Sequence, residues 1–211
     1  MSIFSPHSHS SSNPRRLARG FTLIELMAVV AIMTILTAVL LLQQQKFDSS
    51  TLLRSLAYSV ALSVRQAQVY GTSVRQFDAT ANGFSYNYGV YFAQGDANNY
   101  YLFADVNNDG IYQDPGEKVQ QFKIGSGYAI KDFCGVIDSS HQDCVSGGAI
   151  NRLTVYFKRP DPDAKFTTNV GSNYCGAYIV LSGPGTNTRT VKITSTGQIQ
   201  IGNVNAAVTG C

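Results

Sequence analysis

An apolar run near the N-terminus, from Phe21 to Leu42, constrains this chain more than any other feature of its sequence. The run has 22 residues, and Glu25 is its single ionisable residue. At about 1.5 Å per residue, a helix of this length spans roughly 33 Å, which is enough to cross one bilayer. Buried helices of soluble cores seldom continue this long without polar residues, so the run predicts a membrane-spanning helix.

Glu25 is the unusual residue in this run. A carboxylate inside an apolar helix costs a few kcal/mol in lipid unless it meets a partner. A cut between Gly20 and Phe21 would create such a partner, because the new N-terminal amine of Phe21 in a neighbouring copy carries the opposite charge. The sequence therefore predicts that Glu25 is neutralised between chains.

These residues resemble a known motif. The stretch Gly20-Phe21-Thr22-Leu23-Ile24-Glu25 is similar to the prepilin motif of type IV pilins and type II secretion pseudopilins. The resemblance implies cleavage after Gly20, N-methylation of Phe21 and an assembly role for Glu25 in the fifth mature position. It also implies four partners: a prepilin peptidase and methyltransferase, other pilin or pseudopilin subunits, the membrane, and an assembly platform.

Residues 1–20 form a polar leader that contains Arg15, Arg16 and Arg19 but no acidic residue. Positive charge stays on the cytoplasmic side, so we expect a single-pass protein of the cytoplasmic membrane with an exported head, later part of an extracellular or periplasmic filament. A secretory signal would be cut after its apolar stretch, not before it. Removing three of 16 basic residues leaves 13 against 13 acidic ones, so net charge gives little support to nucleic-acid binding, which stays uncertain.

The apolar pattern changes after Leu42. Through 43–71 apolar residues recur at helical spacing on one face, without Pro or Gly before Gly71, which predicts an amphipathic continuation of the helix that ends at Gly71. We therefore divide the chain into a leader (1–20), a membrane and filament-core helix (21–42), an amphipathic helix (43–71) and a head (72–211). Many major pilins have a proline at the position of Leu42, and its absence here departs from that pattern.

The head is predicted to be β-rich. Short alternating or apolar runs separated by Gly, Asn and Pro predict strands and turns. The runs are Val74–Phe77, Phe84–Phe92, Tyr100–Asp105, Lys118–Ile124, Leu153–Lys158, Ala177–Leu181, Arg189–Thr194 and Gln198–Ile201. The fold class is thus α+β, with a long helix packed on a mainly antiparallel sheet. The many tyrosines and phenylalanines of these runs suit half-buried strand surfaces, or a stacking platform for carbohydrate or single-stranded DNA.

Four cysteines, Cys134, Cys144, Cys175 and Cys211, lie in the part predicted to be exported. An even number of cysteines in an oxidising compartment fits two disulfides, with three connectivities open. We favour Cys134 with Cys144 and Cys175 with Cys211. A zinc site is the alternative, but the sequence has no Cys-x-x-Cys pair.

One loop resembles a calcium site. Asp105, Asn107 and Asp109 occupy the first, third and fifth positions, and Gly follows at the sixth, as in a calcium-binding loop. The spacing then fails, because Glu117 falls one position late, although Asp114 can substitute. The other interpretation is a hairpin turn whose Asp and Asn side chains accept hydrogen bonds from backbone amides. Calcium is the single cofactor that the sequence suggests.

No nucleophile motif or phosphate-binding loop is present in the sequence, so we do not expect an enzyme. Lys158, Arg159, Arg189 and Lys192 are expected on a solvated face.

Three segments are similar to minor pseudopilin H and FimT-like minor pilins: Leu56–Val74, Phe103–Glu117 and Arg189–Gly197. The insertion from Phe133 to Gly148 departs from them. The resemblance implies a structural subunit, a minor pilin or pseudopilin. The alternative is a DNA-uptake or adhesive pilin whose head binds a ligand.

Overall fold

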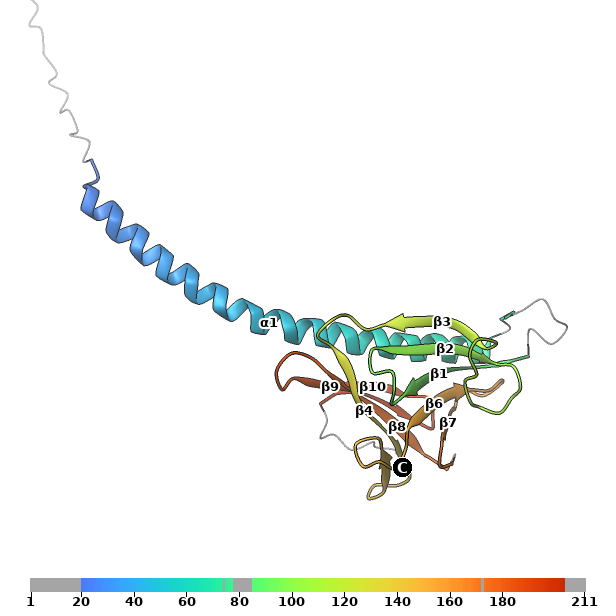
Figure 1. Cartoon of the computed structure of the whole chain (residues 1–211). Helices are drawn as coiled ribbons and strands as arrows, with labels where there is room; N and C mark the ends of the chain where they lie inside the picture. Colours follow the sequence, from blue (N-terminus) through green and yellow to red (C-terminus); the bar gives the residue numbers. More distant parts are fainter. Residues whose placement is uncertain (1–19, 74, 78–84, 172, 204–211) are drawn as a thin grey trace, which may run out of the picture. The chain divides into compact units, whose positions relative to one another are not determined.

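The computed structural model describes residues 20–73, 75–77, 85–171 and 173–203, without the side chains of 43–48. The chain divides into two compact units, Met1–Gln44 and Gln45–Cys211. The first contains the beginning of a long helix, α1, and the second contains the rest of α1 and all ten strands of the described part (Figure 1). The α+β fold class is therefore confirmed.

Helix α1 runs from Leu23 to Thr72 and has 50 residues. Thr22 caps its first turn, because its side-chain Oγ1 accepts a hydrogen bond from the Glu25 amide at 3.3 Å. The Thr22 carbonyl accepts one from the Leu26 amide at 3.2 Å. Thr at the cap and Glu three residues later are typical of a helix start. They place the start of α1 at Leu23, two residues after Phe21.

Gly71 lies near the C-terminal end of α1, where the helix packs closely against a strand. The helix continues through this residue, although the sequence predicts that it ends the helix. A Cβ atom at Gly71 would lie 2.6 Å from the carbonyl oxygen of Phe157 and 2.8 Å from its Cβ. Gly71 thus allows α1 to approach the backbone of a strand more closely than any side chain permits.

Ten strands form two five-stranded antiparallel sheets, in the orders β3-β2-β1-β6-β7 and β10-β9-β8-β4-β5. Each sheet mixes consecutive and distant segments of the head. The strands are β1 (Asn87–Ala93), β2 (Asn99–Asp105), β3 (Lys118–Lys123), β4 (Ala129–Val136), β5 (Gln142–Cys144), β6 (Arg152–Phe157), β7 (Ala164–Thr168), β8 (Gly176–Ser182), β9 (Thr188–Thr194) and β10 (Ile199–Gly202).

The strand predictions are partly wrong. Residues 75–77 form no strand, and Val74 lies outside the described residues. Strands β4, β5 and β7 were not predicted. In β4, Lys131 and Asp132 interrupt the apolar alternation, and a register shift between Ile130 and Asp132 accommodates the extra residue. Strands β5 and β7 are only three and five residues long, too short for a clear period.

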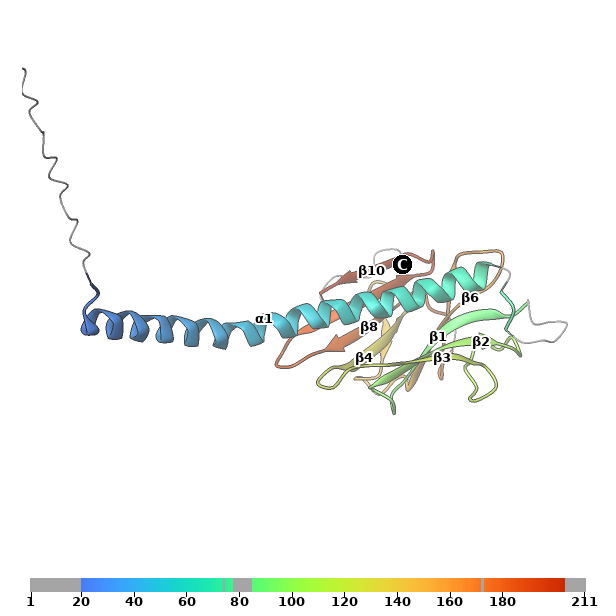
Figure 2. The ribbon, with the colours of Figure 1, turned by 90° about the horizontal axis from the view of Figure 1, so that it is seen from above.

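One apolar face of α1 lies in the hydrophobic core of the head. Leu53, Ala57, Val60, Val64 and Ala67 recur at helical spacing and are all buried. They belong to one core cluster with apolar residues from the inner faces of both sheets. Figure 2 shows this part of the helix with β10 on one side and β1, β2 and β3 on the other. The predicted amphipathic face is therefore the surface on which both sheets pack.

The close approach at Gly71 yields a test. We expect Gly71→Ala to lower the free energy of unfolding by about 1–2 kcal/mol. Overpacking costs about 1–3 kcal/mol, while the gain in helix propensity returns up to about 1 kcal/mol. Denaturant unfolding of the full chain in detergent measures the change. Gly125→Ala is the control, since a Cβ there meets nothing within 4 Å; equal stability of the two variants would contradict the packing described.

Candidate functional site

The segment before α1 is open to an enzyme. Gly20, Phe21 and Thr22 precede the first helical residue, and a Cβ at Gly20 meets no heavy atom within 4 Å. The side chain of Phe21 is 81% exposed. The Gly20–Phe21 peptide bond, where the sequence predicts cleavage, therefore lies in a non-helical, accessible stretch.

Glu25 occupies the first turn of α1. An acidic side chain is favoured there, because the unsatisfied amides at the start of a helix carry partial positive charge. Among the described residues, the Glu25 carboxylate has no hydrogen-bond or ion-pair partner; the Thr22 contact uses the backbone amide of Glu25. In an apolar surrounding this carboxylate needs a partner, and its pairing with a neighbouring copy stays a prediction.

The segment Leu23–Leu42 is long and apolar enough to cross a membrane, and none of it is buried within the structure. Large apolar side chains are exposed on every side of it, from Val29 at 47% to Leu23 at 77%. A contiguous apolar surface of this size is not stable in water, so lipid or other helices must cover it. The helix therefore marks the chain as a single-pass, membrane-anchored protein.

A comparison with protein families found a match that covers most of the apolar segment of α1. The model of the prokaryotic N-terminal methylation motif matches residues 15–41, which include Gly20, Phe21 and Glu25. No curated protein and no solved structure matches the chain. The match supports a subunit of the type IV pilin-like or pseudopilin class, whose members are structural and not catalytic, and it implies a prepilin peptidase and other pilin subunits as partners.

The predicted calcium loop is built around a buried carboxylate. Asp105 has no exposed surface. Its Oδ1 accepts a hydrogen bond from the Asp109 amide at 3.0 Å, and its Oδ2 accepts one from the Gly110 amide at 3.1 Å and one from Asn87 Nδ2 at 3.3 Å. Burial raises the pKa of Asp105, and these hydrogen bonds oppose the rise.

Glu117 holds the other end of the same loop. Its two carboxylate oxygens accept hydrogen bonds from the amides of Val106 and Gln113, each at 2.9 Å. Asp109 Oδ1 accepts one from the Ile111 amide at 2.7 Å, and exposed Asp114 pairs with Lys118 Nζ at 3.0 Å. The structure brings these groups into one loop in which they cap amides, as an Asx-rich turn does.

Calcium binding by Asp105, Asn107, Asp109, Asp114 and Glu117 therefore stays a prediction. Asn108 and Gly110 have φ angles of 61° and 70°, in the left-handed region that Asn and Gly tolerate best. The backbone therefore reverses here through residue choice and amide caps.

Cys134 and Cys144 form a disulfide, as predicted. They face each other in register on β4 and β5. Asp132 lies close to both sulfurs and is grouped with them as a potential metal site among the described residues, but sulfurs joined in a disulfide have no thiolate for a metal. The second predicted link, Cys175 with Cys211, stays a prediction because Cys211 lies outside the described residues.

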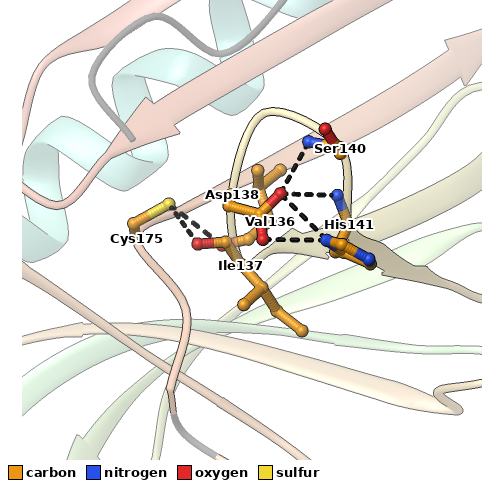
Figure 3. A network of polar contacts seen from close by, with 6 residues as sticks. All are labelled: Val136, Ile137, Asp138, Ser140, His141 and Cys175. Carbon is orange, nitrogen blue, oxygen red and sulfur yellow. Dashed lines mark hydrogen bonds and ion pairs between the residues drawn. The ribbon is translucent and has the colours of Figure 1, made fainter.

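The turn between β4 and β5 is ordered by contacts of the Asp138 side chain (Figure 3). Asp138 Oδ1 accepts hydrogen bonds from the amides of Ser140 at 2.7 Å and His141 at 2.9 Å. His141 Nδ1 lies 2.8 Å from Asp138 Oδ2. The Ser140 amide and then the His141 side chain lower the pKa of Asp138. Beside them, Cys175 Sγ lies 3.3 Å from the Val136 carbonyl oxygen. The Asp138 carboxylate therefore stays ionised and lies against the His141 ring.

The aromatic residues divide between two roles. Tyr88, Phe92 and Tyr100 are buried. Tyr101 and Tyr112, which are half-buried, stack with ring centroids 5.2 Å apart and donate hydrogen bonds to Asp96 at 2.6 Å and Asp114 at 2.9 Å. The hydrogen bond to Asp96, followed by burial, raises the pKa of Tyr101 to about 12. Most of the predicted aromatic surface is therefore core, and these two rings join the 105–117 loop to its sheet.

Sequence reasoning missed a groove between α1 and β10. Its lining residues come from one exposed side of the helix and from the last strand with its preceding turn: Tyr58, Ala61, Leu62, Arg65, Gly197, Gln198, Ile199 and Ile201. Tyr58, Leu62 and Arg65 stand at helical spacing, and this spacing was the sequence signal for one wall of the groove.

The sequence predicts that Lys192 is solvated, and this prediction is wrong. Lys192 is only 4% exposed, and burial lowers its pKa.

The loop geometry leads to a test of calcium binding. We expect calcium to raise the melting temperature of the full chain no more than magnesium does, because the carboxylates already cap amides. Asp109→Asn should change stability by less than about 0.5 kcal/mol, since Asn favours the same turn. Thermal unfolding with each ion measures this. A saturable, calcium-selective rise that disappears in Asp109→Asn would establish the calcium site instead.

Proposed function

We propose that this chain is a structural subunit of a type IV pilus or a type II secretion pseudopilus. It is made with a leader of residues 1–20, cut after Gly20 and N-methylated on Phe21. One observation carries the proposal: an accessible Gly20–Phe21 bond precedes an exposed apolar helix whose single carboxylate, Glu25, stands in the first turn. The matched methylation motif supports the same conclusion.

Cleavage links processing to assembly. It removes the three arginines of the leader and creates a positive amine at Phe21. The Glu25 carboxylate of a neighbouring copy can then pair with that amine, which offsets the cost of placing both charges among apolar helices. The membrane holds the subunit until an assembly platform transfers it to the filament. There, segment 21–42 packs against equivalent helices, and the head stays outside.

We further propose that it is a minor subunit, of the minor pseudopilin H or FimT-like kind. The helix that enters a β-rich head, the hairpin loop at 105–117 and the β9–β10 hairpin support this assignment. The segment 133–148, which departs from that family, forms most of the β4–β5 hairpin with its disulfide. This hairpin is therefore the feature on which the subunit differs from its simpler relatives.

The first test is the mature N-terminus. Mass spectrometry of the membrane or filament protein should find a chain that begins at Phe21, carries one added methyl group and lacks residues 1–20. Gly20→Ala should block cleavage, because the peptidase of this class requires glycine before the cut. An intact N-terminus in wild-type membranes would contradict the proposed processing.

The second test is Glu25→Ala. This variant should insert and be cut normally, yet assemble about tenfold less or worse. Each 1.4 kcal/mol is a factor of ten, and an unpaired charge in an apolar site costs more than that. Glu25→Asp is the matched control, since it keeps the carboxylate and should retain part of the yield. Filament yield per processed subunit is the measurement, and wild-type yield from Glu25→Ala would refute the pairing.

A further inference from the structure

The groove between α1 and β10 is large and apolar for an exposed surface. Its volume is about 510 Å³, and its two large helix residues are well exposed, Leu62 at 67% and Tyr58 at 49%. A second hollow of about 240 Å³ continues it and shares Tyr58 and Ile201. Figure 2 shows β10 alongside this part of α1. Together these hollows, the α1–β10 groove, offer enough space for a short segment of polypeptide.

The α1–β10 groove is cationic. Arg65 lines the first hollow, and Arg54 and Arg189 line the second. Their contacts within the described residues are with neutral groups: Arg65 with Gln68, Arg189 with Asn203, and Arg54 with the Tyr58 ring. No carboxylate of the described part forms an ion pair with any of the three. The groove therefore favours an acidic occupant.

The groove also borders an open sheet edge. Strand β10 is the last strand of its sheet, and no described strand pairs with its outer side. Unpaired amides and carbonyls on such an edge can bind another strand, with each hydrogen bond contributing about 0.5–1.5 kcal/mol. The favoured occupant is thus acidic and at least partly extended.

The opposite edge of the same sheet has matching properties. Strand β5 is its other terminal strand, and the turn before it contains Asp138, whose half-exposed side chain lies 2.8 Å from His141 Nδ1. Asp143 in β5 adds a second carboxylate, which accepts a hydrogen bond from Tyr174 at 2.8 Å. The remaining edge strands, β3 and β7, carry Lys118, Lys123 and Lys165 instead. Of the described edges, β5 is the acidic one.

We propose that the acidic hairpin tip Ile137–Cys144 of a second copy docks in the α1–β10 groove. Asp138 and Asp143 meet the groove arginines, and β5 lies along the edge of β10. This contact rests on the proposed function, since it is made between subunits. It joins two different surfaces of one chain, and a heterologous contact that does not close into a ring generates a helical filament.

The acidic loop at 105–117 is a weaker occupant. Two of its carboxylates, Asp105 and Glu117, are buried. Asp138 also caps amides and pairs with His141, but its side chain is half-exposed. No described strand pairs with the outer side of β5, and the Cys134–Cys144 disulfide holds the Ile137–Cys144 tip in shape. A preformed segment loses less conformational entropy on binding.

Photo-crosslinking of the full chain in cells that assemble it tests the contact. With Leu62 replaced by a photoreactive benzoylphenylalanine, the crosslink should join two copies of this chain and map to a peptide within 137–144. The same group at Val69, which is exposed on the helix but outside the groove lining, is the control and should not reach this peptide.

Charge exchange tests the pairing itself. Arg189→Glu and Asp143→Arg should each lower the crosslink yield about threefold to tenfold, as expected for one or two exposed ion pairs, and the double variant should restore much of it. The Cys134–Cys144 disulfide, measured by non-reducing peptide mapping, reports that the hairpin is still formed in each variant. No recovery in a folded double variant would contradict the pairing.

The outcomes separate this proposal from the proposed function. A crosslink from Leu62 to another part of a second copy, to a different protein or to lipid would overturn the docking, as would no crosslink in assembled filaments; the filament subunit would still stand. An uncut N-terminus together with an absence of filaments would overturn the proposed function and the docking with it.

Discussion

The structure depends on one helix, α1, which must be stable in two different environments. In the first unit, α1 is apolar on every side, so it is stable only where lipid or other helices cover it. In the second unit, a single apolar face packs against both sheets while polar residues cover much of the rest. Burying each large side chain of this face stabilises the head by about 1.5–3 kcal/mol. The same backbone element therefore serves as anchor and as core.

Much of this arrangement could be predicted from the sequence, because helical patterns are local. The apolar run and the amphipathic period located α1 to within two residues at each end, and the strands with clear alternation were found. Strand β4 was missed because its charges interrupt the alternation. Glycine commonly ends a helix, so the sequence predicts a helix end at Gly71. Its role in the structure instead depends on Phe157, which is 86 residues away. Such contacts leave no local pattern.

The candidate functional sites also differ in whether their residues are close together in the sequence. The Gly20, Phe21 and Glu25 motif lies within six consecutive residues, so the sequence alone identified it. The α1–β10 groove combines a helix face with the last strand, and only the fold brings them together. The loop at 105–117 is an intermediate case: its sequence fits a calcium site or an amide-capped turn, and the fold shows the amide caps of Asp105 and Glu117, while calcium binding stays a prediction.

Filament assembly through the apolar segment of α1 is the central claim. The most direct measurement is a cryo-EM reconstruction of purified filaments that contain this chain, at a resolution that shows side chains. We expect residues 23–42 to lie in the filament core, with the Glu25 carboxylate within hydrogen-bonding distance of the Phe21 amine of a neighbouring subunit. Filaments in which this segment lies at the surface, or in which Glu25 faces no amine, would contradict it.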